Sequence, residues 1–146
     1  MISALSVGPT GQFHAVVWID HHEAKVFRFE TEASQAIHHV IRAEHSPAHL
    51  HHKANSIGSG HAPINHVYLD KVAAAINDAK AILIVGPASA KHEFYKHLEQ
   101  HHQGLLKLIV GVEPMDHPQD GPLLAHAVHA FRSAARLGLP YSPQHK

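Results

Sequence analysis

Residues 81–98, AILIVGPASAKHEFYKHL, combine two kinds of local structure. The first five residues form a short, continuous apolar run, which is typical of a strand that is buried on both faces. A Gly-Pro pair ends that run, and apolar side chains then recur at helical spacing to about His102. Ser89 belongs to the residue types that cap helix N-termini. The segment therefore predicts a buried strand that leads directly into a helix.

The flanking segments repeat this alternation of strand and helix. Residues 63–79 and residues 122–136 each carry an apolar stripe at helical spacing, and Asp70 falls off the first stripe, which predicts a solvent-facing side chain. Between them, residues 105–114 follow a helix-stopping glycine, Gly104, and contain another apolar run of the buried-strand type. Such alternation predicts parallel strands joined by right-handed helical crossovers.

The N-terminal segments have the spacing of strands. Residues 14–20 (HAVVWID) form a short β-branched apolar run, residues 24–30 (AKVFRFE) alternate between apolar and polar side chains, and residues 35–41 continue with period two. Short strands joined by short turns predict an antiparallel meander. Trp18 and Phe29 fall within these strand patterns, so we expect both in the core rather than on a surface that stacks with bases.

Together the segments have the order β-β-β-α-β-α-β-α. This order predicts an α/β fold with one mixed sheet of five to six strands and helices packed on it, as in the ribonuclease H-like architecture. A chain of 146 residues fits a single domain, which we place at residues 13–137. Residues 1–12 predict a flexible lead, and residues 138–146 a tail. Residues 43–63, rich in His, Ser, Gly and Pro, predict a long mobile loop.

The composition excludes several classes of protein. The chain has no cysteine, which excludes disulfides, thiol catalysis and cysteine-ligated zinc. No apolar run approaches the roughly 20 residues of a membrane span, and the first residues lack the pattern of a signal peptide, so we expect a cytoplasmic protein with no membrane partner. The net formal charge is zero, unlike that of basic nucleic-acid-binding proteins. Nineteen histidines predict a strongly cationic molecule on mild acidification.

Two segments resemble parts of known translation factors. Residues 14–29, HAVVWIDHHEAKVFRF, resemble the opening hairpin of the middle domain of archaeal and eukaryotic peptide-chain release factors and of pelota, the ribosome-rescue protein. Residues 81–98 resemble the strand, Gly-Pro turn and helix of the same domain. Over about residues 14–137 the chain is most similar to the bacterial members of this superfamily, the translational machinery proteins. The resemblance implies association with the ribosome or tRNA, in rescue or termination.

The loop between the third strand and the first helix departs from the release-factor pattern. In those factors it holds a Gly-Gly-Gln tripeptide, whose glutamine promotes ester hydrolysis in the peptidyl-transferase centre. Here the equivalent residues 57–61 read Ile-Gly-Ser-Gly-His. Pelota also lacks the tripeptide and rescues ribosomes without hydrolysing the ester. The resemblance therefore implies a role in translation and leaves open whether the chain catalyses a reaction.

This loop is the first candidate site. Its glycines permit backbone conformations that other residues avoid, and its lysine and histidines suit RNA phosphates. The residues expected to contact RNA there are Lys53, Gly58, Ser59, Gly60 and His61. The alternative is an ordinary mobile loop.

The turn at residues 86–91 is the second candidate site. A helix that begins after a strand presents free backbone N–H groups and the positive end of its dipole, and both favour an anion. Ser89 and Lys91 would add a hydroxyl and an amine to a phosphate contact, although the P-loop pattern is absent. The alternative is a tight turn in which Ser89 caps the helix.

A hydrolase that acts on RNA or on a peptidyl-tRNA ester is an alternative function. Two-metal nucleases need several carboxylates around the ions, and Asp20, Glu113 and Asp116 follow or end predicted strands. The strand at 81–86 ends without an acid, so the carboxylate set is incomplete. Asp20 and His61 are the candidate catalytic residues, and Asp20 is equally a residue type of hairpin turns.

A histidine-rich metal-binding or pH-responsive module is a further alternative. Imidazole is a common ligand of zinc, nickel and copper. The candidate ligands in the loop are His45, His49, His51 and His52. His97 and His101 share a helix face at i, i+4 and would bind zinc or nickel adventitiously. Because no complete metal motif is present, we predict no dedicated metal or other cofactor.

Overall fold

The computed structural model describes residues 13–30, 36–43 and 65–137. Its elements in chain order are the strands β2 (Phe13–Ile19), β3 (Glu23–Phe29) and β4 (Ile37–Arg42), helix α3 (His66–Ala75), strand β5 (Ala79–Gly86), helix α4 (Ala90–His101), the 3₁₀ helix η2 (Gln103–Leu108), strand β6 (Ile109–Pro114) and helix α5 (Asp120–Leu137). None of these helices has the length and apolar character that crossing a bilayer requires. The predicted lead, the loop after Ala43 and the tail lie outside the described residues.

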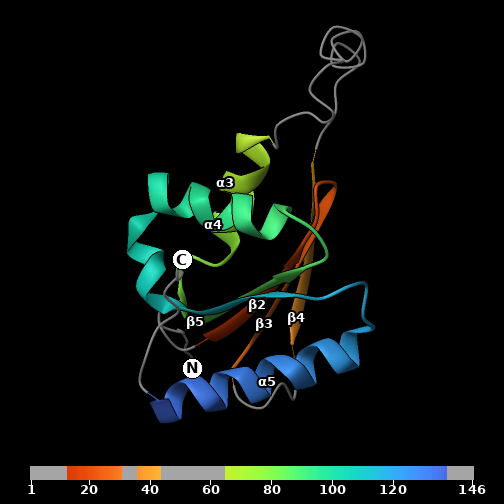
Figure 1. Cartoon of the computed structure of the whole chain (residues 1–146), viewed down its shortest axis with the longest axis vertical. Coiled ribbons are helices and arrows are strands. Elements are labelled where there is room, and N and C mark those ends of the chain that lie inside the picture. Colours follow the sequence, from red (N-terminus) through yellow and green to blue (C-terminus); the bar gives the residue numbers. More distant parts are fainter. Residues whose placement is uncertain (1–12, 31–35, 44–64, 138–146) are drawn as a thin grey trace, which may run out of the picture.

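The five strands form one mixed sheet in the order β4-β3-β2-β5-β6, which confirms the predicted fold class. β2 pairs antiparallel with β3, and β3 with β4, so the N-terminal part is the predicted meander. β2 also pairs parallel with β5, and β5 with β6. Helices α3 and α4 cover one face of the sheet and α5 covers the other (Figure 1). The central strands are therefore enclosed on both faces.

Strand β2 shows why a central strand of this sheet is almost uniformly apolar. Successive side chains of a strand point to opposite faces. Ala15, Val17 and Ile19 pack with residues of α3 and α4, whereas Val16 and Trp18 pack with residues of α5. All five are at most 2% exposed. Because both faces are buried, neither set of alternate positions has room for polar side chains.

Helix α3 is shorter than its apolar spacing predicts. It begins at His66 because Asn65 caps it, with Oδ1 accepting a hydrogen bond from the Val67 amide at 2.7 Å. Ala79, expected on the helix, instead opens β5, and its amide donates to the Ile76 carbonyl at 3.1 Å in the turn between the two elements. Alanine fits the apolar face of a helix and a buried strand equally well, so spacing alone does not distinguish them.

Two further boundaries differ from the prediction. Within residues 105–114, which were predicted to contain the last strand, residues 105–108 belong to the 3₁₀ helix η2 and the strand begins at Ile109. Helix α5 begins at Asp120, two residues before the predicted Pro122, and proline is accommodated there because first-turn amides lack an intrahelical acceptor. The buried stripe of α5 includes Leu123, whereas Ala135, expected to be buried, is exposed.

Candidate functional site

Four histidines gather where the start of helix α3 meets the end of helix α4. His66 is the first residue of α3, His97 and His101 lie one turn apart on α4, and His102 follows directly. The ring centroids of His66 and His97 are 5.1 Å apart, and those of His97 and His101 are 4.7 Å apart. One ring nitrogen from each of His66, His97 and His101 lies within 4.8 Å of the others. These four histidines and Asp70 are called the histidine cluster below.

Asp70 connects the two helices of the histidine cluster. It lies one turn after His66, and its Oδ1 is 2.7 Å from Nε2 of His97 and 2.9 Å from Nε2 of His102. The hydrogen bond from His102, and to a smaller extent that from His97, holds the pKa of Asp70 below its usual value. The ionised carboxylate can only accept hydrogen bonds, so both rings carry a hydrogen on Nε2.

His97 is the buried member of the cluster. Its side chain is 3% exposed, whereas His66 and His101 are exposed. Its Nε2 bonds to Asp70, but its Nδ1 has no hydrogen-bond partner among the described residues. Buried polar atoms in native proteins are usually paired, so this nitrogen requires an explanation. With the hydrogen on Nε2, the neutral ring presents a lone pair at Nδ1, which is the form of imidazole that binds metal ions.

Sequence reasoning identifies only part of this cluster. The spacing of His97 and His101 indicates their shared face, and the structure confirms that the rings are neighbours. The Asp70 side chain is 56% exposed, in line with its predicted place in solvent, but its carboxylate is bonded by two rings, that of His97 on α4 and that of His102 directly after α4. His66 and Asp70 are also an i, i+4 pair, and this second spacing is the sequence signal for the other half of the cluster. The loop candidates for metal binding lie outside the described residues: His45, His49, His51 and His52.

Asp20 follows β2 and stabilises the β2–β3 turn. Its Oδ1 accepts hydrogen bonds from the backbone amides of His22 at 2.7 Å and Glu23 at 2.9 Å. Its backbone carbonyl accepts a hydrogen bond from the Tyr68 hydroxyl at 3.0 Å. Burial, followed by the negative charges of Asp20 and Glu23, raises the pKa of Tyr68, so the hydroxyl keeps its hydrogen. The turn role considered for Asp20 is thus present in the structure.

Of the other acids of the hydrolase alternative, Asp116 is linked to Asp20 through one histidine ring. His117 Nδ1 lies 3.0 Å from Asp116 Oδ1, and its Nε2 lies 4.0 Å from Asp20 Oδ2. Glu113 Oε1 instead lies 2.6 Å from His126 Nε2. Within the described ranges, the groups of three potential metal ligands contain none of these carboxylates. His61 lies outside those ranges.

The turn at residues 86–91 leads into helix α4 as predicted, but its polar side chains have partners within the protein. Ser89 occupies the N-cap position, yet its hydroxyl donates to Glu93 Oε2 at 3.1 Å instead of capping a backbone amide. Lys91 is 5% exposed and its amine donates to the Ala88 carbonyl. The phosphate contact at this turn stays a prediction.

Comparison with models of protein families finds no match, and comparison with curated protein sequences finds none either. Comparison with solved structures, in contrast, finds matches. The fold resembles a domain of archaeal Pelota. The Pelota protein of Thermoplasma acidophilum matches with a TM-score of 0.52 and 20% identity, over 86% of this chain and 33% of its own. The Pelota of Archaeoglobus fulgidus matches with a TM-score of 0.54 and 14% identity, over 88% and 37%.

An archaeal translation termination factor, aRF1, matches as well. Its TM-score is 0.50 at 10% identity, over 87% of this chain and 39% of its own. This chain thus spans between about a third and two fifths of the length of the Pelota and termination-factor structures. At these low identities the likeness is one of fold. The predicted resemblance to release factors and pelota is confirmed at that level. The loop residues expected to contact RNA lie outside the described part: Lys53, Gly58, Ser59, Gly60 and His61.

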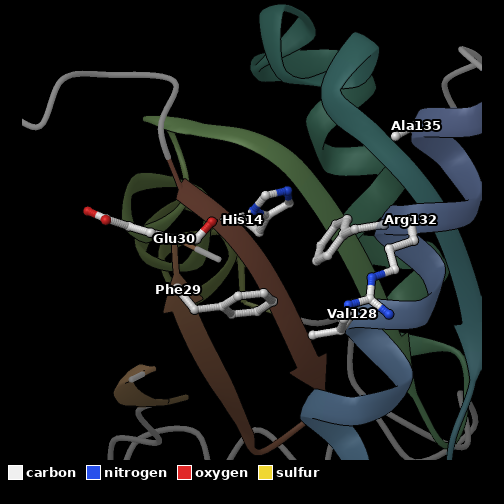
Figure 2. Close-up of a pocket in the computed structure, with 7 residues that line it drawn as sticks. His14, Phe29, Glu30, Val128, Arg132 and Ala135 are labelled. Carbon is white, nitrogen blue, oxygen red and sulfur yellow. Dashed lines mark hydrogen bonds between the residues drawn. The ribbon is translucent and has the colours of Figure 1, made fainter. Parts of the chain in front are cut away.

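A small surface pocket lies between the β2–β3 strand pair and helix α5. Figure 2 shows His14 and Phe29 on the sheet side, facing Val128 and Arg132 of α5. The His14 ring stacks with Phe29 at 5.6 Å between centroids, and its Nδ1 lies 3.2 Å from the Glu30 carbonyl. The pocket volume of about 210 Å³ is below the roughly 300–1,000 Å³ of typical ligand sites. We therefore propose no ligand for this pocket and consider only the half-buried ring of His14 that lines it.

The His14 ring is expected to titrate below pH 6.5. Burial, and then the positive charge of Lys80, lower the pKa of His14 from its ordinary value of 6.5. NMR titration of the ring, assigned by its loss in His14→Gln, measures this pKa. Lys80→Ala should raise the value, because it removes the second of the two causes that lower the pKa. Lys107→Ala, which removes an exposed lysine of η2, should leave it unchanged. An equal shift in both lysine variants would contradict the expectation.

The same shift makes stability depend on pH. Because the pKa of His14 is lower in the folded than in the unfolded state, the unfolded state binds more protons between those two values. The contribution of neutral His14 is therefore fully present above pH 6.5 and is lost as the pH falls below it towards the folded pKa. His14→Gln should flatten the rise of the unfolding free energy with pH in that window.

Proposed function

We propose that this chain is a translation-associated protein that contacts the ribosome or tRNA through residues 43–63. The observation that carries the proposal is the likeness of its fold to Pelota and to a protein described as a translation termination factor. The loop that holds the Gly-Gly-Gln tripeptide in release factors corresponds in sequence order to this segment.

The anchoring of both ends of this segment supports the proposal. At one end, the backbone amide of Ala43 donates to the His22 carbonyl at 2.8 Å. At the other, α3 begins after Asn65, and Tyr68 in its first turn donates to the Asp20 carbonyl at 3.0 Å. Both ends are therefore fixed to the β2–β3 turn, which provides a rigid base for a contacting segment.

The chemistry of the segment is suited to RNA. Lys53 and the histidines would pair with phosphates, Gly58 and Gly60 would let the backbone approach closely, and His61 would provide a polar tip. Ser89 and Lys91 would form a second, weaker contact, since both side chains first have to leave their present partners. Such contacts are electrostatic and depend on salt.

Co-sedimentation with ribosomes tests the proposal. The full chain should pellet with ribosomes at low salt, and binding should weaken as salt rises. Replacing both Lys53 and His61 by alanine should weaken binding at least about tenfold, because two charge-assisted contacts are lost. The matched control replaces Lys96 and His92, an exposed lysine and histidine of α4, by alanine and should bind like the wild type.

Vacant, stalled and terminating ribosomes form the arms of this experiment. Preference for stalled ribosomes indicates rescue, and preference for ribosomes at a stop codon indicates termination. Absence of pelleting in every arm and at every salt concentration refutes the proposed function. An equal loss in the control variant shows that general charge, and not residues 43–63, causes the binding.

A further inference from the structure

We propose that His66, His97 and His101 form a binding site for a zinc ion, with Asp70 as an outer partner that orients His97. The site shares no residue with the proposed RNA contacts, which lie in residues 43–63 and at Ser89 and Lys91.

The spacing of the three rings is close to what zinc requires. One nitrogen from each ring lies within 4.8 Å of the other two. Zinc binds imidazole nitrogen at about 2.0–2.1 Å in tetrahedral geometry, which places neighbouring ligand nitrogens about 3.3 Å apart. Small rotations of the exposed side chains of His66 and His101 would cover this difference. The buried ring of His97 provides the fixed member of the set.

The unpaired nitrogen of His97 is the second and independent observation. Its Nε2 is already bonded to Asp70 at 2.7 Å, so Nδ1 is the nitrogen left for a ligand. That Nδ1 is buried and has no hydrogen-bond partner within the described residues. A metal ion between the three rings would satisfy it, whereas water would need further polar partners at a buried position.

Asp70 has the position of the outer carboxylate found behind metal-binding histidines. Histidine ligands almost always donate their second N–H to a carboxylate, a backbone carbonyl or water, which fixes the ring and makes the ligand more basic. Asp70 accepts such a bond from His97 and is itself held by His102 at 2.9 Å. The neighbouring trio of Asp70, His97 and His102 also lies within 4.8 Å. We do not assign the ion to that trio, because its atoms already satisfy one another by hydrogen bonds.

The ligand set is compatible with zinc and leaves one position open. Three imidazoles and no thiolate suit zinc, nickel and copper, and a three-histidine zinc site leaves its fourth position to water or to a partner's ligand. His66 and His101 are exposed, so that position would face solvent. The cluster therefore has the form of a solvent-accessible site.

Zinc binding to the untagged full-length chain is the test, measured by competition with a chromophoric chelator. The wild type should bind one zinc ion per chain tightly. His66→Gln and His101→Gln should each lower the affinity for that ion at least about 100-fold. Asp70→Asn should lower it about 10–100-fold, the usual effect of losing an outer partner. His92→Gln removes an exposed histidine of α4 outside the cluster and should stay within twofold of the wild type. His102→Gln should cost less than about tenfold.

Two further readouts separate a built site from scattered weak binding by the many histidines. Zinc at 100-fold its dissociation constant should raise the melting temperature of the wild type by roughly 10 °C, and not that of His66→Gln or His101→Gln. Cobalt should give the visible absorption of a tetrahedral ion in the wild type and not in those variants. Binding that is unchanged in both variants, or equally weakened in His92→Gln, overturns the proposal. A larger loss in His102→Gln than in His66→Gln overturns it in favour of the other trio.

Discussion

Gly86→Ala is expected to destabilise the fold by about 3 kcal/mol or more, which would lower the melting temperature by roughly 10 °C or more. Gly86 ends β5 beside the last residue of β2, and a β-carbon there would lie 2.2 Å from the Ile19 carbonyl oxygen and 3.3 Å from its carbon. These are backbone atoms of a buried central strand, so no flexible side chain can move away. On its other side the Gly86 carbonyl accepts a hydrogen bond from Met115 at 2.9 Å. The added carbon must therefore displace one strand from another.

Gly121→Ala is the matched control for this effect. Gly121 lies in the first turn of α5, and an added β-carbon meets no atom of another element within 4 Å. Alanine favours helix over glycine by up to about 1 kcal/mol, but before Pro122 its β-carbon offsets part of this gain, so this variant should stay within about 1 kcal/mol of the wild type. Thermal and urea unfolding followed by circular dichroism measure both variants. Equal stability of the two would show that β5 does not approach β2 as closely as described.

Trp18→Ala is expected to cost about 3–5 kcal/mol of unfolding free energy. Trp18 is 2% exposed and packs with Leu83 and Val85 of β5 in the core under α5. Its indole N–H donates to the Asp116 carbonyl at 2.7 Å, which ties β2 to the segment after β6. The variant leaves a large cavity and removes this hydrogen bond. The core position predicted for Trp18, and likewise for Phe29 at 3% exposure, is confirmed.

Two further variants separate the contributions at Trp18. Trp18→Phe keeps most of the buried apolar volume and loses the hydrogen bond, so we expect a smaller loss of about 1–2 kcal/mol. Val67→Ala removes an apolar side chain that is 61% exposed on α3 and should change stability by less than about 0.5 kcal/mol. Urea unfolding followed by circular dichroism compares all three. A loss in Trp18→Phe as large as in Trp18→Ala would show that the hydrogen bond, and not the packing, dominates.

Local periodicity was sufficient to predict the order of elements and the mixed sheet. Many residues of β2, β5 and α5 follow the same apolar pattern, so a single ambiguous residue does not change the predicted element. Boundaries were less well predicted where residues suit two structures, as Ala79 does. Residues 105–108 show the same limit. A short 3₁₀ helix with one buried side chain, Leu105, has no apolar spacing that distinguishes it from the first residues of a strand.

The sequence alone determines the two pairs of the histidine cluster, because residues four apart on a helix share one face whatever surrounds them. These pairs are His66 with Asp70 and His97 with His101. That the two pairs meet was set by the packing of α3 against α4 on one face of the sheet (Figure 1). Contacts between residues about 30 positions apart depend on how the sheet orders its strands and helices. No local spacing carries that information, and the burial of His97 Nδ1 follows from it.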